Sequence, residues 1–251
     1  MLYLYGITDE SLSDRLAELK GIGNPPEPVT SIQVGHYHVI ISELDRTRHF
    51  GPGDAAAHSR VLECIGESPA VIPIRLGTVA DNIQDLTEVV NANRASLDDL
   101  INRFTGRVEV GIKIYWNENL LRQAMSKLVD LDKARLDSSK NPAQAHDIAV
   151  EIGQMAERIT NSWREEIISK AIRLLRPMAD DMAIGQLTSI YMLCNVSFLI
   201  SRRHGEAFRT LVYQLGDEVG EEFQIHYVEN LPPFSFANIT LGRNDHGGNI
   251  S

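Results

Sequence analysis

The longest regular pattern in the chain is a stripe of apolar residues in its second half. Apolar side chains recur every three or four positions between residues 148 and 175, which is the spacing of one face of an α-helix. The stripe consists of Ile148, Ile152, Met155, Ile159, Trp163, Ile167, Ala171 and Leu175. Pro177 follows it, and proline lacks the amide hydrogen that a helix interior requires. The pattern therefore predicts a helix of about 30 residues that stops at this proline.

Two packings are open to such a helix. Charged residues such as Glu151, Arg158 and Glu165 lie between the apolar positions. They are typical both of a solvated helix face and of the flanks of a coiled coil. We favour packing of the stripe against the rest of the same chain. A coiled-coil scaffold protein built on the stripe is the alternative.

Segments with the composition of strands follow the long helix. We expect two strands over residues 182–190 and 191–201, a helix through residues 207–215 and a strand over residues 223–228. Together with the long helix, these elements predict a smaller C-terminal α+β module.

The N-terminal part of the chain mixes strand and helix patterns. We expect strands over residues 2–7, 71–74 and 108–116, and a hairpin over residues 29–42 that turns near Gly35. Helices are expected to begin at Asp54 and at Asp81, the second ending before Gly106. This order favours helices packed on one face of a mainly antiparallel sheet. The predicted fold class is α+β, with an N-terminal ferredoxin-like variant.

The chain of 251 residues is long enough for two domains of ordinary size. A polar run at residues 130–141 has too few apolar side chains to be core. We therefore predict a ferredoxin-like α+β domain over residues 1–129, a polar connection over residues 130–145 and a C-terminal α+β domain over residues 146–230. Residues 231–251 are predicted to form an extended tail, with Phe234 and Phe236 docked on the body.

The charge balance excludes several classes of partner. The chain has 24 Lys and Arg against 34 Asp and Glu, a formal net charge of -10. Nucleic acids and anionic membranes bind basic surfaces, so neither is expected as a partner. The chain has no signal-peptide pattern, and no segment approaches the ~20 apolar residues of a spanning helix. Cys64 and Cys194 have no CxxC partner. We expect a soluble cytoplasmic protein with buried free thiols.

No group of residues in the sequence indicates a catalytic or ligand-binding site. The chain lacks a nucleophile elbow, a phosphate-binding loop and a zinc-binding helix motif. His36 and His38 would share one face of a strand, a geometry that can hold a metal, but no third ligand accompanies them. We predict no catalytic, cofactor-binding or metal-binding residues, and no enzyme. The alternative is a small-molecule enzyme on a ferredoxin-like scaffold, which a pocket joining His58, Arg75 and a carboxylate would favour.

Two short segments are distinctive. Residues 71–78 have the sequence Val-Ile-Pro-Ile-Arg-Leu-Gly-Thr, in which Pro73 predicts a sheet edge or a bulge because proline cannot donate to the ladder. Arg75 could pair with a carboxylate or with helix-end carbonyls, and Gly77 permits a turn. The second segment contains Pro232, Pro233, Phe234 and Phe236.

With other segments, these two resemble the gas vesicle accessory proteins of the GvpL/GvpF family, and are nearer to GvpF. The resemblance covers most of the chain. Its motifs are Tyr-Leu-Tyr-Gly at 3–6, the helix around His58, residues 71–78, Val-Glu-Val-Gly-Ile-Lys at 108–113, Val-Ser-Phe-Leu-Ile-Ser-Arg at 196–202 followed by Phe208, and Pro-Pro-Phe-Ser-Phe at 232–236. The family usually has a glycine-led GPxPPY-type run near the end, whereas here Glu-Asn-Leu precedes the prolines and Phe234 takes the aromatic place.

The resemblance implies a non-enzymatic accessory or minor structural protein that takes part in forming a hollow protein shell, without a cofactor. Its implied partners are the small, very apolar major shell protein of GvpA type and other accessory gas vesicle proteins. The implied location is the cytoplasm, in association with the gas vesicle. The family-motif residues are expected to be structural: His58, Pro73, Arg75, Gly77, Pro232, Pro233, Phe234 and Phe236. The sequence does not identify the residues that contact a partner.

Overall fold

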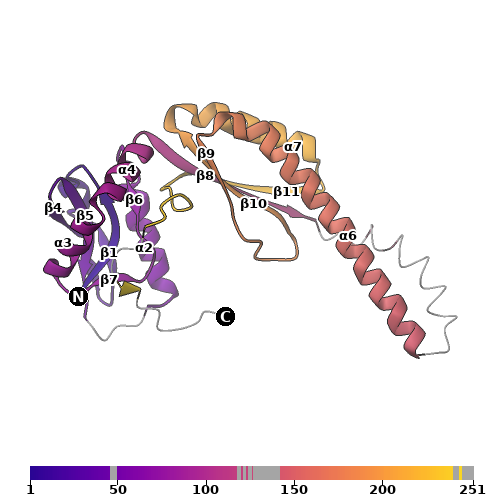
Figure 1. Ribbon diagram of the computed structural model, residues 1–251, viewed down its shortest axis with the longest axis horizontal. Coiled ribbons are helices and arrows are strands. Elements are labelled where there is room, and N and C mark those ends of the chain that lie inside the picture. Colours follow the sequence, from indigo (N-terminus) through magenta and orange to yellow (C-terminus); the bar gives the residue numbers. More distant parts are fainter. Residues whose placement is uncertain are drawn as a thin grey trace. The chain divides into compact units, whose positions relative to one another are not determined.

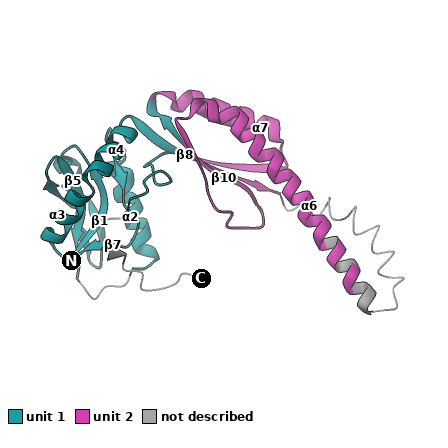
Figure 2. Cartoon of the chain, in the orientation of Figure 1, with its two compact units in different colours: residues 1–109, 199–202, 229–251 teal, residues 110–198, 203–228 magenta. Residues whose placement is uncertain are grey.

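The computed structural model describes residues 1–45, 50–117, 120, 123, 126, 142–239 and 243–244. The chain has an α+β fold with two compact units (Figures 1 and 2). The first unit comprises Met1–Glu109, Leu199–Arg202 and Glu229–Ser251, and the second comprises Val110–Phe198 and Arg203–Val228.

The first unit is built on a six-stranded sheet. Its main path has the order β12-β7-β1-β5-β4, and β6 also pairs with β1. The pairings along this path are antiparallel. The strands are β1 (Leu2–Thr8), β4 (Thr30–Val34), β5 (Tyr37–Glu43), β6 (Ile72–Pro73), β7 (Thr78–Ala80) and β12 (Arg243–Asn244). β1 lies at the centre of the sheet, and its residues are buried along the whole strand.

Helices and a small ribbon complete the first unit. The helices are α1 (Ser13–Leu16), α2 (Pro52–Ile65), α3 (Ile83–Ala92) and α4 (Arg94–Phe104), and the ribbon pairs β2 (Lys20–Gly23) with β3 (Pro26–Pro28). α2 buries Ala57, Val61, Leu62 and Ile65, the face that the apolar spacing predicts. These side chains form one core with Tyr3 and Tyr5 of β1.

One predicted helix is wrong in its extent. The single helix expected between Asp81 and Gly106 is two helices, α3 and α4, which meet at Asn93. The Asn93 side chain donates to the Val89 carbonyl at 2.8 Å. Asparagine competes in this way with the regular helix bonds, which explains the break. α3 begins after Asn82 and not at Asp81.

The start of α2 also differs from the prediction. Asp54 lies inside the first turn, and Gly51 is the residue that precedes the helix. The Asp54 carboxylate accepts a hydrogen bond from the Gly51 amide at 2.8 Å. The acidic side chain therefore closes the helix start from within, as the third residue of a capping box does. The short elements α1, β2 and β3 were not predicted at all.

The second unit is built on a four-stranded sheet of order β11-β8-β10-β9 (Figure 1). Its strands are β8 (Arg107–Trp116), β9 (Asp181–Ile184), β10 (Met192–Ser201) and β11 (Phe223–Leu231). Its helices are α6 (Pro142–Leu175) and α7 (Gly205–Val219), with short 3-10 turns η1 (Arg176–Met178) and η2 (Arg202–His204). By the division above, β8, β10 and β11 each contribute residues to both units.

The long helix predicted from the apolar stripe is confirmed as α6, which ends at Leu175 just before Pro177. Ile167, Ala171 and Leu175 are buried. α6 packs against α7, and the Lys170 ammonium donates to the Glu218 carbonyl oxygen at 3.2 Å. The C-terminal part of the stripe is therefore used inside the second unit.

The strands that follow α6 are shorter than predicted. The strands expected over residues 182–190 and 191–201 are β9 and β10, and residues 185–191 form the connection between them. The compact units also differ from the predicted domains, because residues 199–202 and 229–239 belong to the first unit and residues 110–117 to the second. Most of the predicted polar connection, residues 130–141, lies outside the described residues, and α6 already includes residues 142–145.

Candidate functional site

Two of the family-motif residues, His58 and Gly77, are joined through Tyr3 in the core of the first unit. α2 carries His58 on its buried side, and the Tyr3 hydroxyl of β1 lies 2.7 Å from His58 Nδ1. The other ring nitrogen, Nε2, lies 3.1 Å from the Ile74 carbonyl oxygen. Because a carbonyl only accepts, Nε2 carries the hydrogen and Nδ1 accepts from Tyr3. The Gly77 amide donates to the Tyr3 hydroxyl oxygen at 3.2 Å and completes the network.

Burial keeps both titratable groups of this network neutral. Desolvation lowers the pKa of His58 to about 4, and the hydrogen bond to Ile74 opposes this only in part. Desolvation also raises the pKa of Tyr3 well above its usual value. A general base needs a free lone pair near the operating pH. His58 has a hydrogen-bond partner at each ring nitrogen and therefore no free lone pair. These contacts hold residues 74–77 against β1 and α2.

The motif around Pro73 lies where a strand and a helix approach β1 closely. Pro73 is in β6 and pairs with Gly6 of β1. A Cβ at Gly6 would lie 2.9 Å from Ile65 Cδ1 and 3.2 Å from the Ile72 carbonyl oxygen. The absence of a Cβ at Gly6 therefore favours this close approach of α2 and β6 to β1. Gly77 has a φ of 84°, which explains why a glycine stands at the turn into β7.

Arg75 does not share the environment of His58. Arg75 is exposed, whereas His58 is buried in the core. A pocket that joins these two residues with a carboxylate would have favoured an enzyme. The different burial of His58 and Arg75 does not support such a pocket.

The C-terminal motif is fixed on the first unit by a turn at residues 234–236. Ser235 donates two hydrogen bonds to Glu109, from its amide to Oε2 at 2.8 Å and from its hydroxyl to Oε1 at 2.6 Å. Phe236 is 3% exposed, and its ring centre lies 5.8 Å from the guanidinium carbon of Arg103. This distance is within the range of a cation–π contact.

The other members of the C-terminal motif divide between core and surface. Pro232 and Pro233 are buried. Phe234 is 42% exposed. The expectation that both aromatic rings dock on the body therefore does not hold for Phe234, because the turn leaves this ring partly in solvent.

Sequence reasoning missed Arg202, although it ends the motif at residues 196–202. Its Nη2 donates to the Gly66 carbonyl oxygen at 2.7 Å and lies 3.3 Å from that of Ser68. Gly66 is the C-cap of α2, so the guanidinium meets the negative end of the helix. Burial lowers the pKa of Arg202. The motif marked the residue, but nothing in the sequence connects it with carbonyls 136 residues earlier.

The two histidines considered as metal ligands lie in different elements. His36 is in the turn between β4 and β5, and His38 is within β5. The His36 Nε2 lies 3.0 Å from Asp98 Oδ1, and the same oxygen accepts from the Tyr37 hydroxyl. The hydrogen bond from Tyr37 lowers the pKa of Asp98. In the part of the chain that the structure describes, no three His, Cys, Asp or Glu side chains gather as metal ligands.

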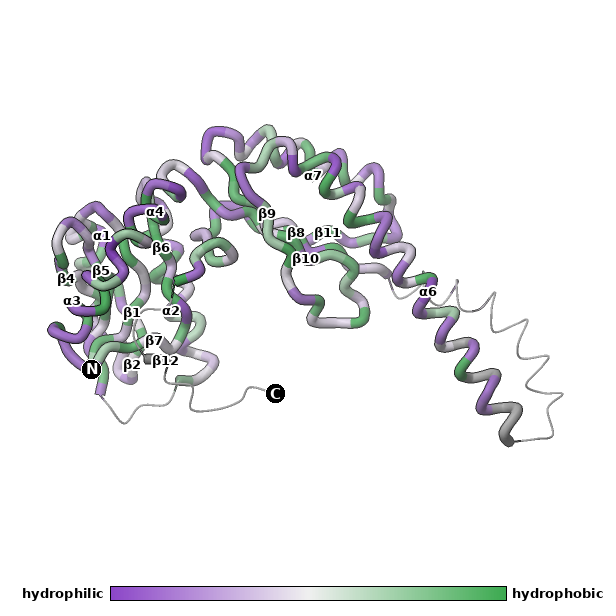
Figure 3. Tube along the Cα trace, in the orientation of Figure 1, coloured by the Kyte–Doolittle hydropathy of each residue, from purple (hydrophilic) through white to green (hydrophobic). Residues whose placement is uncertain are grey.

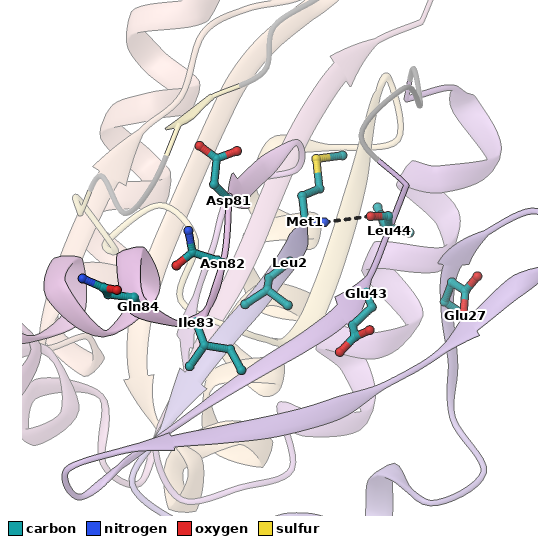
Figure 4. Close-up of a pocket in the computed structure, with 9 residues that line it drawn as sticks. All are labelled: Met1, Leu2, Glu27, Glu43, Leu44, Asp81, Asn82, Ile83 and Gln84. Carbon is teal, nitrogen blue, oxygen red and sulfur yellow. Dashed lines mark hydrogen bonds between the residues drawn. The ribbon is translucent and has the colours of Figure 1, made fainter.

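The first unit has a hollow of about 690 Å³ beside the N-terminus. Figure 4 shows the residues that line it. The Met1 amino group donates to the Leu44 carbonyl oxygen at 2.9 Å at its rim. The hollow is lined by Met1, Leu2, Glu27, Glu43, Leu44, Asp81, Asn82, Ile83 and Gln84. None of these is a family-motif residue. The hollow offers carboxylates without the histidine, cysteine or lysine that commonly completes an acid–base or nucleophilic site.

None of the described helices combines the length and the apolar character needed to cross a bilayer. Cys64 and Cys194 are free thiols, and only Cys194 is fully buried, so the expectation of two buried thiols does not hold for Cys64.

These contacts define a two-unit α+β protein whose distinctive polar residues fix a loop and the C-terminal segment, and comparison with known proteins places it among the gas vesicle proteins. The family model for the gas vesicle synthesis protein GvpL/GvpF matches residues 1–238. The chain belongs to this family, and the resemblance seen in the sequence is confirmed.

Individual relatives agree with this family and indicate GvpF. Gas vesicle protein F of Nostoc sp. strain PCC 7120 is 26% identical over 243 residues, which are 95% of this chain and 98% of the relative. The crystal structure of GvpF from Anabaena sp. PCC7120 has a TM-score of 0.77 at 26% identity and covers 95% of this chain and 98% of its own. The fold of GvpF from Microcystis aeruginosa is also similar, with a TM-score of 0.73 at 24% identity, over 95% of this chain and 99% of its own. The role of this chain is therefore related to gas vesicles.

Proposed function

We propose that this chain binds the small apolar shell protein of a gas vesicle, of GvpA type, during assembly of the shell, and that it does so without catalysing a reaction. Membership of the family supports the gas vesicle role. The observation that carries the binding role is a group of exposed apolar side chains next to an edge strand of the second unit. Its members are Ile184, Leu187, Ile190 and Tyr191. Exposed apolar groups of this kind commonly mark protein interaction sites.

The proposed mode of binding uses an exposed sheet edge. β9 ends the four-stranded sheet and pairs only with β10 among the described strands. Edge strands commonly offer backbone amide and carbonyl groups to which an extended segment of another protein can add as a further strand. The formal net charge of -10 favours solubility of the free chain and would complement basic positions on a partner.

We propose further that the first unit is a ferredoxin-like variant. The antiparallel order β7-β1-β5-β4 supports a ferredoxin-like variant in the first unit, with α2 in one crossover and α1 with the β2–β3 ribbon in the other. We also propose a structural role for the family-motif residues and a role for residues 130–141 as the connection that precedes α6. Other accessory gas vesicle proteins are proposed as further partners, and the cytoplasm, in association with the vesicle, as the location.

Co-purification tests the binding role directly. The affinity-tagged chain is co-expressed with the major shell protein, and the shell protein retained on the resin is quantified. We expect retention by this chain and none by an unrelated acidic protein of similar size. Equal amounts of shell protein in the two eluates would contradict the proposal.

A further inference from the structure

The connection between β9 and β10 presents apolar side chains to solvent. Ile184 at the end of β9 is 64% exposed, and Ile190 is 73% exposed. Leu187 and Tyr191 are more than one-third exposed. Figure 3 shows green, apolar stretches along this connection. A single exposed apolar residue is ordinary, but four of this size in one short segment form a patch that water solvates poorly.

The end of this connection, residues 189–192, is held in a fixed shape by hydrogen bonds. The Tyr191 amide donates to the Ser189 hydroxyl at 3.1 Å, and the Met192 amide donates to the Ser189 carbonyl at 3.1 Å. Trp116 of β8 donates hydrogen bonds to the carbonyl oxygens of two consecutive residues in this turn, Ile190 and Tyr191. Its ring Nε1 donates to the Ile190 oxygen at 2.9 Å, and its backbone amide donates to the Tyr191 oxygen at 3.1 Å.

Aromatic packing supports the same turn. Trp116 is buried, and its ring centre lies 5.6 Å from that of Tyr191 and 5.9 Å from that of Trp163 on α6. The exposure of Ile190 is therefore a feature of the ordered, folded second unit. A surface that is already ordered loses little conformational entropy when a partner binds, which favours affinity.

Acidic side chains border this apolar turn across the end of β8. The Trp116 amide bonds to Tyr191 on one side, and the Asn117 amide bonds to the Glu222 carbonyl at 3.0 Å on the other. Glu221 and Glu222 are exposed. Neither has an ion-pair partner within the described residues. A hollow of about 250 Å³ adjoins them, lined by Asn117, Leu120, Gln123, Glu221 and Glu222.

We propose that the apolar turn and the two carboxylates together bind a segment of the shell protein in which a large apolar side chain stands beside lysine or arginine. This assignment rests on the proposed function and names the surface and the chemistry of the contact. The apolar side chain would cover Ile190 and Tyr191, and the cation would face Glu221 and Glu222. Charge complementarity argues against a second copy of this chain, since symmetric pairing would bring like carboxylates together. It argues equally against a phosphate-bearing partner.

The test uses two variants of the tagged full-length chain in the co-purification with the shell protein. Ile190→Asp places a charge at the centre of the apolar turn, and we expect at least about tenfold less retained shell protein, as for loss of an interface hot spot. The double variant Glu221→Lys, Glu222→Lys is expected to retain roughly fivefold less, because it repels a basic segment. Raising the salt concentration should weaken the wild-type complex and leave that of the double variant less affected.

Matched variants in the first unit serve as controls. Ile83→Asp changes an exposed isoleucine (56% exposed) in the same way. Asp9→Lys, Glu10→Lys changes the net charge by the same amount at two adjacent exposed acids. Both should retain wild-type amounts of shell protein. All variants should melt near the wild-type temperature, since each site is exposed.

The outcomes distinguish a wrong surface assignment from a wrong proposed function. If the wild-type chain retains no shell protein, the proposed function fails and this surface loses its partner with it. If the wild-type chain and Ile190→Asp retain equal amounts, the function stands and the surface assignment is overturned. Equal losses in the control variants would also overturn it, because the effect would then come from general charge or stickiness.

Discussion

Glu109 accepts both hydrogen bonds that Ser235 can donate, although the two residues are 126 positions apart in the chain. Glu109 is buried at the start of β8, and Ser235 lies in the turn of the C-terminal segment. A buried carboxylate is unfavourable unless hydrogen bonds replace its lost hydration. The contact therefore fixes the C-terminal segment on the first unit and satisfies the acid at the same time.

Glu109→Ala should lower the free energy of unfolding by about 2 kcal/mol, since it removes a charged acceptor of two hydrogen bonds. Ser235→Ala removes only the hydroxyl bond and should lower it by about 1 kcal/mol. Urea denaturation followed by circular dichroism measures both. Glu63→Ala, at an exposed position of α2, is the control and should change stability by less than about 0.5 kcal/mol. Equal stability of Glu109→Ala and the control would show that the contact is not formed in solution.

The two phenylalanines of the same segment make a second test. Phe236 is buried and Phe234 is not, so Phe236→Ala should lower stability by about 3 kcal/mol through lost burial and a cavity. Phe234→Ala should lower it by less than about 1 kcal/mol. The melting temperatures of the two variants, recorded side by side, give the ranking. The reverse ranking would mean that Phe234 and not Phe236 anchors the segment.

The sequence predicted those elements whose pattern is long and local. The stripe that forms α6 repeats over many turns, so its period could be recognised without any knowledge of what covers it. The ribbon of β2 and β3 could not be predicted in this way. It is held by Tyr5 of β1, whose hydroxyl accepts from the Ile22 amide at 2.8 Å and lies 3.0 Å from Ser42 Oγ. A tertiary contact decides that structure, and short segments have little pattern of their own.

The same reason limits what could be predicted of the motif residues. Their identity was visible as a family pattern, and the glycine at position 77 was expected at a turn. Their partners were not visible, because His58 bonds to Tyr3 at a separation of 55 residues and Arg202 bonds to Gly66 at a separation of 136. Pairing over such distances leaves no periodic signal in a single sequence.

The buried histidine makes the first unit sensitive to acid. The pKa of His58 is about 4 in the folded chain, below the value of about 6.5 that a histidine has when unfolded. As the pH falls below about 6.5, the unfolded chain binds the proton first, so folding loses stability until both states are protonated below about pH 4. Stability is therefore complete above about pH 6.5, and the total loss through this group is about 3 kcal/mol.

Two variants isolate this effect. His58→Phe removes the titrating group and the hydrogen bonds that the Tyr3 hydroxyl and the Ile74 carbonyl make to it, so it should be about 2 kcal/mol less stable than the wild type at neutral pH. The difference should shrink or reverse towards pH 4. Tyr3→Phe removes the two hydrogen bonds of the Tyr3 hydroxyl, with His58 and Gly77, but keeps the histidine buried. It should retain the wild-type dependence on pH because burial is the main cause of the pKa shift. Denaturation curves measured from pH 7 to pH 4 check both. Parallel curves for the wild type and His58→Phe would be inconsistent with a buried neutral histidine.

A pair of glycine substitutions separates backbone strain from helix propensity. Gly77 has a φ of 84°, and a Cβ there would meet nothing nearer than Phe50 Cδ2 at 3.9 Å. Gly77→Ala should therefore destabilise through the backbone alone, by about 1 kcal/mol. Gly153 lies within α6 with open space around its Cβ position, so Gly153→Ala should stabilise the helix by about 0.5 to 1 kcal/mol. The same chemical change thus predicts opposite signs, which thermal denaturation of the two variants can detect. A gain in stability for Gly77→Ala would mean that residues 74–77 adopt another backbone conformation, and that the Tyr3 and His58 network does not fix them.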